Sequence, residues 1–82
     1  MKRGGGVTMK YFLATYKTVA GDHEYTESGV LVSTSWNTAE KRAIKGRKLF
    51  IRFGFEECCF LDHIREIPRE HYAVLKKYFA NV

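Results

Sequence analysis

The chain has little proline, little cysteine and no long apolar segment. One proline and two cysteines occur in 82 residues, a composition unlike that of proline-rich disordered segments or disulfide-rich secreted domains. No apolar run approaches the roughly 18–20 residues that a transmembrane helix requires. The N-terminus also lacks the apolar core of a signal peptide. With 45% hydrophobic residues, we expect one soluble, cytoplasmic, globular domain with no membrane partner.

The chain also lacks the spacing patterns of metal and catalytic sites. Cys58 and Cys59 are neighbours, and successive strand residues point to opposite faces, so we expect two small buried thiols rather than a disulfide. No Cys-x₂-Cys or His-x₃-His pair is present, as a zinc site would require. There is no phosphate-binding glycine loop and no serine-centred elbow. We therefore expect no metal, no cofactor and no catalytic residue, and a protein that is not an enzyme.

Residues 1–8 differ in composition from the rest of the chain. They contain three of the seven glycines and two bases, and a second methionine follows at Met9. The segment Lys-Arg-Gly-Gly-Gly-Val is what a purine-rich ribosome-binding site spells when it is translated. We expect residues 1–8 to be disordered and to be a misassigned start before Met9, the alternative being a flexible basic tail. Residues 9–82 are then a single folded domain.

Two segments near the N-terminus predict a β-hairpin. Residues 10–19 and 24–33 are rich in aromatic and β-branched residues and have no helical period. Ala20-Gly21-Asp22 lies between them, and glycine and aspartate adopt turn geometries readily. The short connection predicts that the two strands are antiparallel.

A helix is predicted over residues 38–53. Asn37 suits the N-cap, and Glu40 stands three residues later, as in a capping box. At about 100° per residue, an apolar and a basic stripe fall on opposite sides of this helix. The apolar stripe is Trp36, Ala39, Ala43, Gly46, Phe50 and Phe53, and the basic stripe is Lys41, Lys45, Lys48 and Arg52. Gly46 would let the helix approach the sheet closely, and Gly54 suits the C′ position.

Residues 57–65 predict a third strand, and Pro68 suits the first turn of a second helix that ends near Ala80. Two apolar sets compete for the inner face of the strand. One set is Cys58, Phe60 and Ile64, and the other is Cys59 and Leu61. The order ββαβα predicts an α+β fold: a three-stranded, mostly antiparallel sheet with two helices packed on one face.

Acidic residues are almost absent from residues 40–52. This stretch contains one acid, Glu40, and six bases. The bases are Lys41, Arg42, Lys45, Arg47, Lys48 and Arg52. The rest of the chain has 8 bases and 8 acids, so the net charge of +5 belongs to this stretch. A helix face of one sign can serve as a docking surface for an anion, and this is one interpretation of the stretch. The alternative is a solvated face, although solvated faces usually mix both signs.

The basic face leads to the first functional hypothesis, a small non-enzymatic module that binds nucleic acid or another polyanion. The residues assigned to this contact are Lys41, Arg42, Lys45, Lys48 and Arg52. Because phosphate contacts carry no direct sequence information, we expect recognition to depend weakly on sequence.

The predicted hairpin carries large apolar side chains on both faces, and two helices on one face leave the other bare. A second copy of the chain is the simplest cover, which predicts a homodimer; the alternative is a partly wet sheet face. The second functional hypothesis is a protein-binding module, such as a viral or mobile-element inhibitor of a host protein. The residues assigned to this protein interface are Tyr11, Leu13, Tyr25 and Leu31.

Four short segments carry a resemblance to known proteins. They are Lys10-Tyr11-Phe12-Leu13, Thr15-Tyr16-Lys17, Gly21-Asp22-His23-Glu24-Tyr25 and Glu66-Ile67-Pro68. In these segments, and over most of the chain from Met9, the sequence resembles small uncharacterised ββαβα proteins of archaea, bacteria and their viruses. The resemblance favours a viral or mobile-element origin, and it brings no activity and no functional residue with it.

Overall fold

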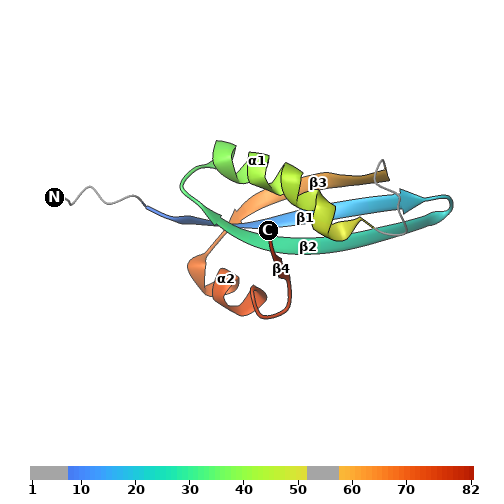
Figure 1. Ribbon diagram of the computed structural model, residues 1–82. Coiled ribbons are helices and arrows are strands. Elements are labelled where there is room, and N and C mark those ends of the chain that lie inside the picture. The colour runs from blue at the N-terminus through green and yellow to red at the C-terminus, as the bar shows by residue number, and fades with distance from the viewer. Residues whose placement is uncertain (1–7, 52–57) are drawn as a thin grey trace.

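The computed structural model describes residues 8–51 and 58–82. Their strands form one mixed sheet in the order β3-β1-β2-β4, and the fold class is α+β (Figure 1). The elements are β1 (Lys10–Ala20), β2 (His23–Ser33), α1 (Trp36–Gly46), the 3₁₀ turn η1 (Arg47–Phe50), β3 (Cys59–Ile67), α2 (Arg69–Leu75) and β4 (Ala80–Asn81). The predictions for residues 1–8 fall outside the described residues except at Thr8. Those for Arg52, Phe53 and Gly54 fall outside them as well.

β1 and β2 form the predicted antiparallel hairpin. Ala20 pairs with His23 across a two-residue loop. Gly21, the first loop residue, has a φ of +64°, in the left-handed region that glycine adopts without a steric penalty. The turn signal in the sequence therefore marks the end of the hairpin correctly.

β3 pairs antiparallel with β1, and a register shift opposite Thr15 and Tyr16 interrupts the pairing. A strand without a bulge would place alternate residues on one face. Here the bulge brings Cys59, Leu61 and Ile64 to the same face, where all three pack on the core. The two competing sets of inner residues are thus each correct over part of the strand.

α1 begins at Trp36 with Ser35 as its N-cap, so the prediction of Asn37 as the cap is wrong. The Ser35 Oγ accepts a hydrogen bond from the Thr38 amide at 3.2 Å. Its hydroxyl satisfies a first-turn amide that has no partner inside the helix, and this fixes the helix start. The α-helix ends at Gly46, where helix propensity is low, and continues as η1 rather than as α-helix to Phe53.

The two helices lie on opposite faces of the sheet, so the predicted one-face arrangement is wrong (Figure 1). Tyr11 and Phe12 are successive residues of β1 and point to opposite faces. Phe12 contacts Trp36 of α1, with ring centroids 5.1 Å apart, whereas Tyr11 contacts Tyr72 of α2 at 4.9 Å. The second face of the sheet is itself apolar at this end, and α2 folds over it, where Ile67 is buried.

The second helix is shorter than predicted because the chain leaves it to join the sheet. Pro68 is its N-cap, and the helix ends at Leu75, whose carbonyl accepts hydrogen bonds from the amides of Tyr78 and Phe79, both at 2.9 Å. β4 then pairs in parallel with β2. The sheet therefore has four strands instead of three.

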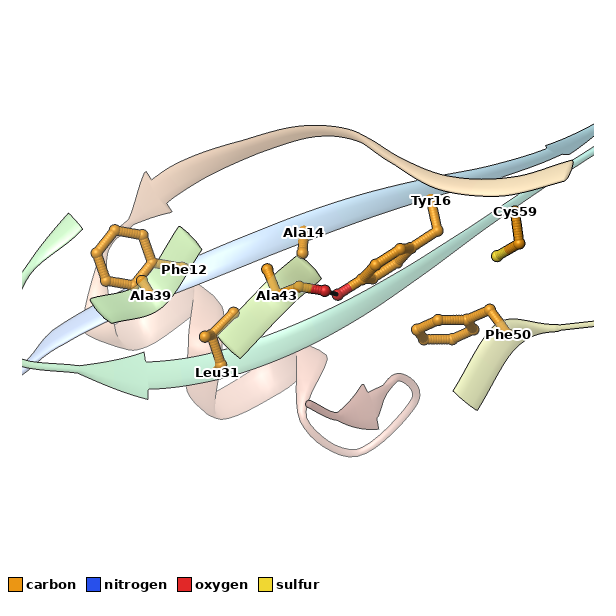
Figure 2. Close-up of a cluster of buried hydrophobic side chains, with 8 residues drawn as sticks. All are labelled: Phe12, Ala14, Tyr16, Leu31, Ala39, Ala43, Phe50 and Cys59. Carbon is orange, nitrogen blue, oxygen red and sulfur yellow. Dashed lines mark hydrogen bonds between the residues drawn. The ribbon is translucent and has the colours of Figure 1, made fainter. Parts of the chain in front are cut away.

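The core lies between α1 and the sheet (Figure 2). Its buried residues are Phe12, Ala14, Tyr16, Leu31, Ala39, Ala43, Phe50 and Cys59. Both helical residues of the cluster are alanines, so α1 approaches the strands closely. The larger side chains come from the strands and from Phe50 of η1.

Candidate nucleic-acid interface

The buried side of α1 determines which side chains face outward. Ala39 and Ala43 are fully buried against the sheet. Positions three to four residues apart share one face of a helix. The two alanines thus fix the rotation of α1, and the opposite surface carries its basic side chains.

Lys41, Lys45 and Lys48 form this outer surface, which we call the lysine face. All three side chains are exposed on α1 and η1. Within residues 8–51 and 58–82, no ion pair joins any of them to a carboxylate. At four and three residues apart, they span roughly 10 Å along the helix axis. The lysine face is therefore a short row of positive charge facing solvent.

Two large apolar side chains accompany the lysine face. Ile44 is 52% exposed and Leu49 is 61% exposed. Neither belongs to the apolar stripe that the sequence assigns to the core, and the sequence interpretation missed both. Helical spacing could have predicted their exposure, because Ile44 lies between Lys41 and Lys45 and Leu49 follows Lys48, away from the buried side of the helix.

The Arg42 side chain, which the sequence assigns to the nucleic-acid contact, is exposed and makes two hydrogen bonds within the protein. Its Nη1 donates a hydrogen bond to the Val32 carbonyl, and its Nη2 donates to the Val82 main-chain oxygen at 3.1 Å. The guanidinium thereby joins α1 to β2 and to the segment after β4. Two main-chain acceptors at this short range orient the guanidinium toward the protein rather than outward with the lysines.

Arg47, the next arginine of the basic run, does not extend the lysine face. Arg47 is half-buried, and its Nη1 donates to the Cys59 carbonyl at 3.1 Å. Arg52 lies outside the described residues. Of the five residues predicted to contact nucleic acid, the structure thus brings Lys41, Lys45 and Lys48 together on one surface, whereas the Arg42 guanidinium is bonded to main-chain oxygens.

The residues predicted to form a protein interface do not share a face. Tyr11 and Leu13 pair with Val32 and Val30 on the α2 face, and both are half-buried. Leu31 pairs with Phe12 and is fully buried against α1. Tyr25 pairs with Thr18, on the same side of the sheet as Leu31. Leu31 as a contact residue is therefore a wrong prediction, since strand parity places it in the core.

The expected homodimer rested on a sheet face without a helix. α2 covers the Tyr11 end of that face, so that argument no longer holds for the whole face. Farther along it, Phe60 pairs with Lys17 and is exposed. Self-association stays a prediction.

Among the residues that the structure describes, Tyr16 carries the clearest pKa shift, and it lies in the core. Burial is the main cause that raises its pKa to about 12, and the nearby Cys59 adds to the shift. The hydroxyl donates to the Ala43 carbonyl at 2.5 Å. The neutral phenol is a satisfied structural group, held away from the lysine face by the helix between them.

The cysteines and histidines form no cluster in the described part of the chain. Cys58 and Cys59 are free thiols, and Cys59 is buried as expected while Cys58 is half-buried. His63 Nδ1 lies 3.0 Å from the carboxylate of the adjacent Asp62. Within residues 8–51 and 58–82, no three His, Cys, Asp or Glu side chains are placed to hold a metal ion.

Among the residues that the structure describes, no helix has the length and apolar character needed to cross a bilayer. Comparison of the chain with protein families, curated proteins and solved structures found no match.

Proposed function

We propose that the protein is a small non-enzymatic module that binds nucleic acid through the lysine face. The observation that carries this proposal is the set of three exposed lysines without acidic partners in the described chain. Three uncompensated cations on one surface repel one another, and a polyanion relieves that repulsion.

The lysine face suits the phosphate backbone rather than base edges. Duplex DNA carries one charge per about 1.7 Å of its axis, so a row of roughly 10 Å meets several phosphates. Lysine ammonium groups act as point charges on flexible stems and do not impose the paired geometry of a base contact. Ile44 and Leu49 offer apolar area to the sugars beside those phosphates. We therefore infer weak recognition with little sequence dependence.

Titration of labelled duplex and single-stranded DNA and RNA at several salt concentrations tests this proposal. Three neutralised phosphates give a log–log salt slope of about −2.7 on duplex DNA, with a Kd around 10⁻⁴–10⁻⁶ M at physiological salt. The double variant Lys45→Glu, Lys48→Glu should abolish binding. Both side chains are exposed, so the fold should remain intact.

The matched control is Arg69→Glu, Lys77→Glu, which removes two exposed bases from the α2 side of the molecule. It changes the net charge by the same amount, and it should leave most of the binding in place. Equal losses in the two variants would show that net charge alone attracts the polyanion. A lack of binding at about 50 mM salt would reject the proposal and favour a protein partner.

A further inference from the structure

α2 is loosely packed on its face of the sheet. The helix has seven residues, all described, and none of them is fully buried. Leu75 is half-buried, and Val74 is 55% exposed. A helix this short depends on tertiary packing for its stability. Its incomplete burial leaves apolar surface open between the helix and the sheet.

That surface is a cleft of about 250 Å³ between α2 and the end of β3. Its lining residues are Arg65, Ile67, His71, Val74 and Leu75. On α2, His71, Val74 and Leu75 are spaced by three and four residues and share one face. On β3, Arg65 and Ile67 are two residues apart and share one face. Ile67, Val74 and Leu75 therefore give the cleft apolar walls.

Both polar residues that line the cleft are bases. Arg65 and His71 are exposed, and in the described chain neither side chain has an ion pair or hydrogen bond. The nearest carboxylate along β3, Glu66, pairs at 3.8 Å with Lys10, and it points to the opposite face because it is adjacent to Arg65 in the strand. The cleft thus combines apolar walls with an unpaired guanidinium.

We propose that this cleft binds a small amphiphilic carboxylate, with its apolar chain against Ile67, Val74 and Leu75 and its carboxylate on Arg65. At about 30 Å³ for each non-hydrogen atom, the cleft of about 250 Å³ holds roughly eight such atoms, which is most of an eight-carbon carboxylate such as octanoate. A guanidinium donates two parallel hydrogen bonds to a carboxylate, and this pairing is stronger than a neutral one. The site lies on the face of the sheet opposite α1 and does not depend on the lysine face.

Titration of the full chain with sodium octanoate, followed by amide chemical shifts, tests the proposal. We expect shifts concentrated at Ile67, Val74 and Leu75 and a Kd on the order of 0.1–1 mM. Arg65→Gln should weaken octanoate binding by about tenfold and leave the weaker binding of octanol unchanged. Val74→Ser should weaken both ligands, since it removes part of the shared apolar wall.

Arg69→Gln is the matched control. It removes one exposed base from the first residue of α2, outside the lining of the cleft, and should leave octanoate binding unchanged. Equal loss in Arg65→Gln and Arg69→Gln would overturn the proposal, because general charge would then explain binding. Equal affinity for octylamine and octanoate, or shifts centred on the lysine face, would overturn it as well.

Discussion

Tyr16 shows how one residue places a polar group inside a small core. Its ring stacks on Phe50, with centroids 4.6 Å apart. Its hydroxyl reaches across to the Ala43 carbonyl of α1, so the same side chain fills volume and joins sheet to helix. A buried hydroxyl without a partner would be destabilising, and this one is satisfied within the protein.

Replacing Tyr16 should change how stability depends on pH. An unfolded tyrosine has a pKa of about 10, whereas burial raises the pKa of folded Tyr16 to about 12. Above pH 10 the unfolded chain therefore loses this proton first, and the free energy of unfolding falls as pH rises toward 12, by up to about 1.4 kcal/mol per pH unit. Tyr16→Phe should lack that fall. At pH 7 it should lower the free energy of unfolding by about 1 kcal/mol, because one hydrogen bond is lost.

Urea unfolding at pH 7, 9, 10 and 11 measures both effects. Tyr78→Phe is the control, because Tyr78 is 77% exposed and its removal should preserve the alkaline loss. If Tyr16→Phe lost stability above pH 10 as steeply as the natural chain, another group would be responsible for the pH dependence.

At the scale of elements, local signals in the sequence predicted the hairpin and the existence of both helices. The turn at Gly21-Asp22 and the two flanking strands are determined by residues close together in the sequence, so they could be predicted without knowledge of the tertiary fold. The N-cap was misplaced because Ser35 and Asn37 are both good caps, and only the packing of α1 decides between them. The bulge in β3 was not predictable, because it depends on register with β1.

The Val82 side chain, which follows β4, packs against one glycine of α1 and one glycine of β2. A Cβ added at Gly46 of α1 would overlap the Val82 side chain, and one added at Gly29 of β2 would overlap it too. The Val82 amide donates to the Val30 carbonyl at 2.8 Å. The sequence interpretation assigned Gly46 to close approach between helix and sheet, and the structure adds that Val82 occupies the space.

Gly46→Ala should therefore destabilise the fold even though alanine favours helix by up to about 1 kcal/mol. We expect a loss of about 1–3 kcal/mol in the free energy of unfolding, as for other overpacked sites. Val82→Ala removes the atoms that the new methyl group would meet, so the double variant should lose less than the two single variants together. A urea-based double-mutant cycle measures this coupling, expected at about 0.5–3 kcal/mol. Strict additivity would mean that Val82 does not fill the space at Gly46.

At the scale of the whole molecule, the predicted α+β class is confirmed, but the predicted placement of both helices on one face of the sheet is wrong. Element order alone leaves that choice open for α2, which follows the last long strand. The decision comes from two residues of the second face: Tyr11, which contacts Tyr72 of α2, and Ile67, which is buried there and requires a cover. β4 was missed because two residues carry no periodic pattern, and its pairing with β2 is set by tertiary contacts.

At the candidate site, too, the sequence predicted local relations but not contacts with residues distant in the chain, as the basic run of residues 40–52 shows. Helical spacing correctly predicted that Lys41, Lys45 and Lys48 lie together, since that relation is local. It did not separate them from Arg42, because the acceptors on Val32 and Val82 are distant in sequence. Whether a base in such a run bonds to the protein or faces solvent thus depends on where main-chain oxygens elsewhere in the fold are placed.

This division of roles predicts opposite phenotypes for two variants that each remove one positive charge. Arg42→Gln should lower the free energy of unfolding by about 1–2 kcal/mol, because two hydrogen bonds from a charged donor are lost at an exposed site. Its salt slope on duplex DNA should stay the same. Lys45→Gln should change stability by less than about 0.5 kcal/mol and should reduce the magnitude of the salt slope by about 0.9, the share of one phosphate.

Urea unfolding and duplex titration at several salt concentrations, carried out on both variants, measure the two roles separately. Hydrogen exchange at the Val82 amide adds a local readout, since losing the Arg42 guanidinium should speed its exchange, while Lys45→Gln should not. The reverse pattern, a reduced salt slope with unchanged stability in Arg42→Gln, would place Arg42 in the binding surface. Val82 would then be held in place by its hydrogen bond to the Val30 carbonyl and by its packing against Gly29 and Gly46, without a contribution from Arg42.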